Sequence, residues 1–172
     1  MVNSIKKLAI LGSTGSIGRQ TLQVVRNLAG RFQVVGLAAG QNLELLSDQI
    51  AEFQPKYIYY QSKNLVPGPS HDRGSQLAIH SCTFLPMEEI AGHPDVDIVV
   101  IATSGKAGLS ATLAAVRAGK KVAIANKEPL VMAGEIITGE AKKSGAQLLP
   151  IDSEHSAIWP VSYTHLTLPT RG

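Results

Sequence analysis

A short apolar run followed by three evenly spaced glycines is the feature that most constrains this chain. Residues 8–11 form an unbroken apolar stretch of strand length, and Gly12, Gly15 and Gly18 follow at a spacing of three. Apolar residues then recur at helical spacing up to residue 28. A strand, a glycine turn and a helix in this order predict a β–α unit whose helix start faces an anion.

The three glycines have different expected roles in such a unit. Gly12 allows a sharp turn, Gly15 lets the backbone approach a pyrophosphate, and Gly18 lets the helix pack close to the strand. The spacing G-x-x-G-x-x-G differs from the commoner G-x-G-x-x-G. A glycine-rich turn that binds no ligand is therefore the alternative interpretation.

Length and composition indicate a single globular domain without a membrane span. The chain has 172 residues, 44% of them hydrophobic, and no apolar run approaches the roughly 20 residues that cross a bilayer. The N-terminus leads straight into the first predicted strand, so no signal peptide is expected. Cys82 is the only cysteine, which favours a reducing, cytoplasmic location. The net charge of +3 comes from scattered basic residues and suits an anionic ligand as well as nucleic acid.

Strand-length apolar runs alternate with helical patterns along the rest of the chain. Further strands are expected at 32–38, 57–60, 76–80, 97–102, 122–125 and 147–151. Helices are expected at 42–53, 107–118 and 130–144, with a helical turn at 86–90 and stops at Gly119 and Gly145. This alternation predicts an α/β fold with a Rossmann-like, doubly wound, mainly parallel sheet.

Polar clusters follow five of the predicted strands. They lie at 12–18, 40–42, 103–105, 126–128 and 152–155. In a parallel α/β sheet the ligand binds beyond the carboxyl ends of the strands. The five clusters together therefore predict one site at that edge of the sheet.

The cluster after the second strand bears on the choice of dinucleotide. An acidic residue at this place holds the ribose hydroxyl of NAD, but here the residues are Gly40, Gln41 and Asn42. Nothing there repels a 2′-phosphate, and the side chains offer neutral donors. The sequence therefore favours NADP over NAD, although no Lys or Arg stands there to pair with the phosphate.

The last two clusters carry charged groups suited to catalysis. Asp152 and Glu154 lie two apart, so on a strand both carboxylates share one face and attract a cation such as Mg²⁺ or Mn²⁺. A solvated loop is the alternative. Lys127 can pair with a substrate anion, and the alternative is that Lys127 is solvated while Asn126 caps the following helix.

Three segments, in this order, resemble the 1-deoxy-D-xylulose 5-phosphate reductoisomerase family. They are Gly-Ser-Thr-Gly-Ser-Ile-Gly at 12–18, Ala-Asn-Lys-Glu at 125–128 and Leu-Pro-Ile-Asp-Ser-Glu-His at 149–155. Segments 37–42 and 113–119 are also similar to the family, and the similarity extends from residue 5 to about 159.

The resemblance implies a role for each matching residue. The NADPH-binding residues would be Thr14, Gly15, Ser16 and Ile17 at the pyrophosphate, Gly40, Gln41 and Asn42 at the ribose phosphate, and Asn126 and Glu128 near the nicotinamide half. Substrate would contact Lys127, Ser153 and Glu154, with Lys127 and Glu154 catalytic. Asp152 and Glu154 would hold Mg²⁺ or Mn²⁺.

The implied reaction rearranges the carbon skeleton of 1-deoxy-D-xylulose 5-phosphate. NADPH then reduces the product to 2-C-methyl-D-erythritol 4-phosphate, a step of isoprenoid biosynthesis. The resemblance also implies a homodimer for the full-length family member, and no nucleic-acid or membrane partner. A cytoplasmic location is expected, with a plastid origin after loss of a transit peptide left open.

Two features depart from the family pattern. Many members carry Lys where Gln41 stands, so the contact to the 2′-phosphate is expected to be weaker or to come from elsewhere. Family similarity also stops after Trp159, and residues 160–172 match nothing and resemble a foreign tail. The expected domains are an NADP-binding domain at 1–150 and the start of a truncated catalytic domain at 151–172. The chain alone is therefore expected to be inactive.

Two other functions remain open from the sequence. A semialdehyde-dehydrogenase-like oxidoreductase shares the glycine turn but needs a nucleophilic cysteine, for which Cys82 is the one candidate. A non-catalytic dinucleotide-binding module needs only the turn.

Overall fold

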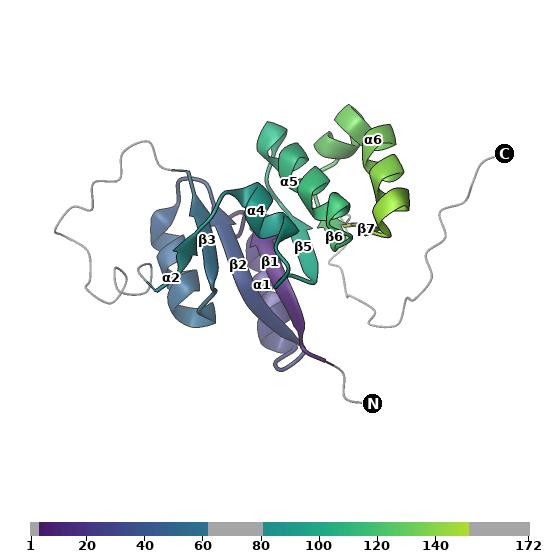
Figure 1. Cartoon of the computed structure of the whole chain (residues 1–172). Coiled ribbons are helices and arrows are strands. Elements are labelled where there is room, and N and C mark those ends of the chain that lie inside the picture. Colours follow the sequence, from purple (N-terminus) through teal and green to yellow (C-terminus); the bar gives the residue numbers. More distant parts are fainter. Residues whose placement is uncertain (1–3, 62–80, 152–172) are drawn as a thin grey trace.

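A seven-stranded parallel sheet forms the centre of the fold (Figure 1). The structure, a computed structural model, describes residues 4–61 and 81–151. The strands are β1 (Lys6–Leu11), β2 (Phe32–Ala39), β3 (Tyr57–Tyr60), β4 (Thr83–Phe84), β5 (Ile98–Ile101), β6 (Lys121–Ile124) and β7 (Gln147–Pro150). Their order across the sheet is β4-β3-β2-β1-β5-β6-β7, and all neighbours pair in parallel.

Helices cover both faces of the sheet, as expected for a doubly wound fold (Figure 1). They are α1 (Ser16–Asn27), α2 (Leu43–Phe53), α4 (Met87–Gly92), α5 (Gly105–Arg117) and α6 (Glu128–Ser144). Alternate residues of strand β1 contribute to the hydrophobic cores on the two faces of the sheet. Leu8 and Ile10 are buried with the apolar side chains of α1 and α2, whereas Ala9 and Leu11 are buried with those of α4, α5 and α6.

The order of the strands creates a place for a ligand. From β1 the chain builds outward through β2, β3 and β4, and it then returns to the other side of β1 to add β5, β6 and β7. The helices after β1 and β5, α1 and α5, pack on opposite faces of the sheet. Doubly wound folds bind ligands at the carboxyl ends of the strands where the connections diverge in this way.

Most predicted elements are confirmed, with ends that differ by a residue or two. Gly119 and Gly145 terminate α5 and α6 with φ of +70° and +76°, as expected of helix stops. The strand predicted at 76–80 lies outside the described residues. β4 was not predicted. Its two exposed residues carry no apolar pattern, and they form a strand because they pair with the neighbouring β3.

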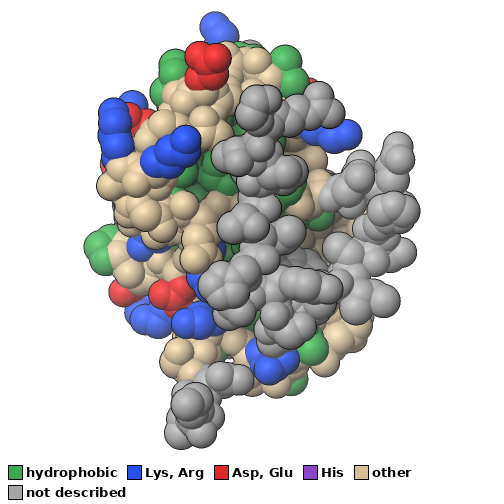
Figure 2. Space-filling view, turned by 90° about the vertical axis from the view of Figure 1, so that its right-hand side faces the viewer, with side chains coloured by type: hydrophobic (Ala, Val, Ile, Leu, Met, Phe, Trp, Pro, Cys, Tyr) green, Lys and Arg blue, Asp and Glu red, His purple; other side chains and the backbone are tan. Residues whose placement is uncertain are grey.

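Basic side chains are spread over the described part of the face around α6 and β7 (Figure 2). Figure 2 shows Lys and Arg side chains at several separate places on the visible part of this face. Across residues 4–61 and 81–151, no helix combines the length and the apolar character needed to cross a membrane.

Candidate dinucleotide site

The glycine turn after β1 is built so closely that side chains are excluded at two of its three glycines. Gly12 has φ of +93°, and a Cβ there would lie 2.6 Å from the carbonyl oxygen of Ala102. A Cβ on Gly18 would overlap the carbonyl oxygen of Gly12. At Gly15 the nearest atom would be 3.5 Å away, so the protein itself has room there and the open side remains for a ligand.

The start of α1 is the one helix start in the described part of the chain that lacks both a capping side chain and a nearby carboxylate. Gly15 is the N-cap, and the first turn contains no acidic residue. By contrast, Asn42 caps α2 by accepting from the N–H of Leu45, and α4 and α6 have acidic first turns. At α5, which has neither, the carboxylate of Glu128 accepts from the N–H of Gly105. The unpaired N–H groups of α1 and its dipole therefore favour an anion such as a pyrophosphate.

The predicted ribose-phosphate residues lie beside this turn. Gly40, Gln41 and Asn42 are all exposed and connect β2 to α2. The glycine turn is bonded to the strand that leads into them, because the carbonyl oxygen of Ala38 accepts from the N–H groups of both Gly12 and Ser13 at 2.8 Å. The structure thus places the two predicted halves of the dinucleotide site on adjacent strand ends.

The third predicted cluster lies at the ends of β5 and β6. The Nδ2 of Asn126 donates to the carbonyl oxygen of Thr103 at 2.6 Å, and Glu128 Oε2 accepts from the N–H of Gly105 at 2.8 Å. The alternative in which Asn126 caps α6 is wrong, because Lys127 is the N-cap and Asn126 reaches back to the neighbouring strand end. Lys127 is exposed.

The predicted metal and substrate residues cannot be placed in the same way. Asp152, Ser153 and Glu154 lie outside the described residues, as does all of the expected second domain (151–172) after Ile151, its tail included. The structure describes the segment that leads into them. The N–H of Ile151 donates to the carbonyl oxygen of Ile124 at 2.9 Å, which continues the pairing of β7 with β6. The chain is therefore heading toward the carboxyl edge of the sheet when it leaves the described range.

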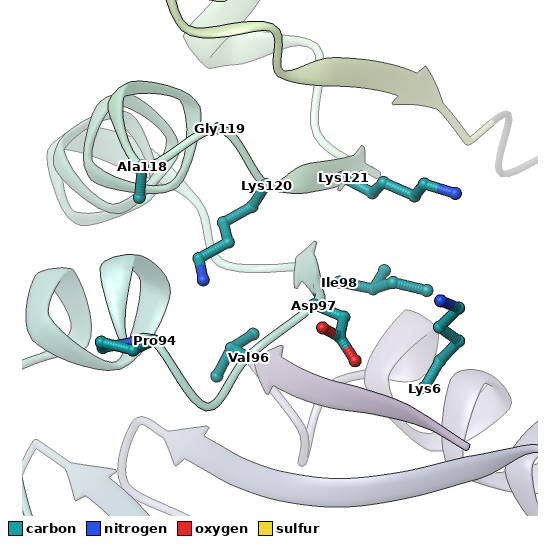
Figure 3. Close-up of a pocket in the computed structure, with 9 residues that line it drawn as sticks. All are labelled: Lys6, Pro94, Val96, Asp97, Ile98, Ala118, Gly119, Lys120 and Lys121. Carbon is teal, nitrogen blue, oxygen red and sulfur yellow. The ribbon is translucent and has the colours of Figure 1, made fainter. Parts of the chain in front are cut away.

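A cavity of about 290 Å³ lies at the amino ends of the strands, opposite the end where the predicted site residues lie (Figure 3). It is lined at the amino ends of β1, β5 and β6 by residues that include Lys6, Asp97, Lys120 and Lys121. Lys120 lies in the short connection between α5 and β6, and Lys121 is the first residue of β6. Asp97 Oδ2 accepts from the N–H of Lys7. This contact gives Asp97 a structural role, and the cavity, at the amino ends of the strands, is not part of the dinucleotide site.

Cys82 lies at the amino ends of the strands, whereas the predicted site lies at their carboxyl ends. It immediately precedes β4, and its Sγ donates to the carbonyl oxygen of Pro55, just before β3. Partial burial raises the pKa of the thiol, whereas a nucleophilic cysteine needs a lowered one. The position and the protonation of Cys82 both argue against a semialdehyde dehydrogenase.

Gln49 is a residue near the site that the sequence pattern did not single out. Its side chain is only 3% exposed, and its Nε2 donates to the carbonyl oxygen of Ser13 in the glycine turn at 2.9 Å. The sequence could have indicated Gln49 by its position, because helical spacing places it on the same side of α2 as Leu46 and Ile50. A polar residue is unusual on such an apolar side.

These features define a class of protein. A doubly wound parallel sheet with a tight glycine turn and an uncapped helix start at its switch point is a Rossmann-type dinucleotide-binding domain. Comparison with known proteins then identifies the family. A sequence model described as 1-deoxy-D-xylulose 5-phosphate reductoisomerase matches residues 8–134, and the chain belongs to this family.

Individual relatives agree with this assignment. The chain is 48% identical over 158 residues to 1-deoxy-D-xylulose 5-phosphate reductoisomerase of Actinobacillus pleuropneumoniae serotype 5b (strain L20). The match covers 90% of this chain and 40% of the relative. The chain therefore spans well under half the length of this curated relative.

Solved structures of the family superpose on the chain. A DOX-P reductoisomerase in complex with NADPH, fosmidomycin and magnesium is 41% identical with a TM-score of 0.77, covering 88% of this chain and 37% of that one. The Zymomonas mobilis enzyme in complex with NADPH is 35% identical with a TM-score of 0.74, covering 88% and 40%. A homoserine dehydrogenase from Thiobacillus denitrificans, at 21% identity and a TM-score of 0.57, shares the fold alone.

Proposed function

We propose that this chain forms the NADPH-binding part of an enzyme that converts 1-deoxy-D-xylulose 5-phosphate to 2-C-methyl-D-erythritol 4-phosphate. The observation that carries the proposal is the glycine turn between β1 and α1. Its tight glycines and the uncapped start of α1 fit a pyrophosphate, and the chain belongs to a family with a solved member in complex with NADPH. NADPH, when bound, would supply the hydride for the reduction.

Each segment of the site has a proposed task. The backbone N–H groups of residues 14–17 would bind the pyrophosphate, and residues 40–42 would contact the ribose phosphate. The bonds from Asn126 to Thr103 and from Gly105 to Glu128 hold the ends of β5 and β6 together. These joined strand ends would form a rigid surface against which the nicotinamide half binds, with Asn126 and Glu128 beside it.

The substrate side of the site depends on charged groups. Lys127 would pair with the substrate and stabilise negative charge that develops on its oxygens. Ser153 and Glu154 would contact the substrate, and Asp152 and Glu154 would hold Mg²⁺ or Mn²⁺. Carboxylate oxygens suit these hard cations, which polarise a carbonyl as Lewis acids. A solved relative has been determined in complex with magnesium.

Calorimetric titration of NADPH and NADH tests the cofactor assignment. We expect weak binding of NADPH, tighter than that of NADH, and loss of both in Gly15→Val because the new side chain would occupy the open side of the turn. Gly139→Val is the control, since its Cβ would have open space around it in α6. Equal affinity for both dinucleotides, or none for either, would reject the proposal.

Paramagnetic relaxation by Mn²⁺ tests the metal assignment. We expect broadening of signals from residues near the end of β7 at millimolar Mn²⁺, since two carboxylates alone make a weak site. Asp152→Ala should abolish it. Broadening that persists in this variant would remove Asp152 from the metal site.

Turnover is proposed for the whole enzyme only. Because the chain spans 40% of the length of its relative, we expect the 172-residue polypeptide to bind NADPH without oxidising it in the presence of substrate and Mg²⁺.

For the whole enzyme we propose a cytoplasmic homodimer that acts on a phosphorylated sugar. Light scattering of a full-length family member carrying this segment measures the oligomeric state, and a monomer would contradict that part of the proposal.

A further inference from the structure

Ser13, in the glycine turn, is held from two sides through its backbone. Its N–H donates to the carbonyl oxygen of Ala38 at 2.8 Å, and its carbonyl oxygen accepts from Nε2 of Gln49 at 2.9 Å. Ala38 lies on β2 just before the loop 40–42, and Gln49 lies within α2, the helix that follows the loop. The segment that contains the ribose-phosphate loop is thus tied to the pyrophosphate turn before the loop by backbone and after it by one side chain.

The identity of Gln49 is not explained by stability. The residue occupies the buried side of α2 with Leu46 and Ile50, each 1% exposed, where an apolar side chain would pack without polar cost. Its Oε1 is buried and has no hydrogen-bond partner among the described residues, and the same holds for Oγ of Ser13. An unpaired buried oxygen is destabilising. A buried polar side chain with an unpaired oxygen therefore indicates a task other than filling the core.

We infer that Gln49 is a positioning residue that fixes the distance between the pyrophosphate turn and the ribose-phosphate loop, and thereby sets the preference for NADPH over NADH. The inference rests on the proposed function. NADPH uses both the turn and the 2′-phosphate contacts in the loop, whereas NADH uses the turn without the phosphate contacts. Loosening the tie between the two segments therefore weakens NADPH more than NADH.

The test measures both affinities in Gln49→Met, which keeps the length and volume of the side chain but cannot donate to Ser13. We expect the ratio of NADPH to NADH affinity to fall at least fivefold, with the NADH affinity within twofold of the parent chain. Thermal stability should fall modestly, because removal of the unpaired Oε1 only partly offsets the loss of the bond to the buried carbonyl oxygen of Ser13. Asp48→Ala, at the exposed neighbouring position of α2, is the control and should leave the ratio unchanged.

A second variant covers a failure of the first to fold. Gln49→Asn retains the amide on a side chain that is one methylene shorter and cannot reach Ser13, so it should show the same selective loss. An unchanged ratio in a folded variant, or an equal loss of both affinities, would overturn the inference. Failure of the parent chain to bind NADPH would instead reject the proposed function, and the two failures are thus distinguishable.

Discussion

The carboxylate of Glu128 accepts a hydrogen bond from the backbone N–H of Gly105 at 2.8 Å, so a residue in the first turn of α6 caps the start of α5. The two residues are 23 positions apart and follow neighbouring strands. Together with the bond from Asn126 to Thr103, this contact makes the ends of β5 and β6 one unit. The structure therefore gives Glu128 a role in the fold that is independent of any ligand.

Glu128→Ala is expected to lower the free energy of unfolding by about 1 kcal/mol, the usual cost of losing a helix cap. The loss arises at both helices, because Glu128 also favours the dipole of α6 from its first turn. Urea denaturation measures the change. Glu135→Ala, an exposed carboxylate further along α6, is the control. If both variants lose the same stability, the contact with Gly105 contributes nothing.

Gly18→Ala is expected to destabilise the fold by roughly 1–3 kcal/mol, because the new methyl group overlaps the carbonyl oxygen of Gly12 and lies 2.6 Å from Cα of Ser13. Backbone atoms cannot move aside as a flexible side chain does, so the turn must shift and NADPH binding should weaken with it. The control is Gly139→Ala in α6, where a Cβ meets open space. That substitution should stabilise by about 0.5–1 kcal/mol, and a loss there similar to that at Gly18 would contradict the steric explanation.

The features that the sequence predicted are those encoded in neighbouring residues. The strand, glycine turn and helix of residues 8–27 carry their own pattern of apolar spacing and glycines, and Asn42 caps the helix that follows it, as its position indicated. The helix stops at Gly119 and Gly145 are equally local, because each needs only one residue with positive φ.

The features that it could not predict depend on residues far apart in the chain. Asn126 has the local pattern of a helix cap, but its amide is used by Thr103, 23 positions away. Gln49 bonds to Ser13 across 36 positions, and the two residues of β4 form a strand only because β3 is beside them. Such partners are chosen by the packing of the sheet, which no local pattern contains.

Tyr57→Phe is expected to destabilise the protein at pH 7 and to have progressively less effect as the pH falls below about 3.9. The Tyr57 hydroxyl donates to Asp95 Oδ2 at 2.8 Å, and this bond, assisted by the charge of Lys56, holds the pKa of Asp95 below its usual value. A lowered pKa in the folded state stabilises it above the unfolded pKa of about 3.9, and the effect is lost as pH falls through the folded value.

Urea denaturation of both proteins at several pH values measures this dependence. Tyr60→Phe is the control, since its hydroxyl has no hydrogen bond within the described residues. A difference between Tyr57→Phe and the parent chain that stays constant from pH 7 to about pH 3 would show that the lost contact is not the one with ionised Asp95.

Alkylation of Cys82 by iodoacetamide is expected to be slow at pH 7.5 and insensitive to NADPH. Burial raises the pKa of the thiol, so less of the reactive thiolate is present than for an ordinary cysteine. The residue lies at the amino ends of β3 and β4, away from the glycine turn. Mass spectrometry follows the reaction, and unfolding in urea should accelerate it. Protection of Cys82 by NADPH would contradict the placement of the site.

Gln41→Lys is expected to tighten NADPH binding about three- to fivefold at low salt, the gain typical of one exposed charge pair. Gln41 is exposed in the loop between β2 and α2, where a lysine ammonium could pair with the 2′-phosphate that NADH lacks. The affinity for NADH should therefore stay the same, and the gain should disappear as the salt concentration is raised from roughly 20 to 500 mM. Gln33→Lys, an exposed position near the amino end of β2, adds the same charge away from the loop and is the control. Titration of both dinucleotides against both variants separates the outcomes. A gain shared by NADPH and NADH, or an equal gain in Gln33→Lys, would show that general charge attraction is responsible and that the 2′-phosphate does not lie beside Gln41.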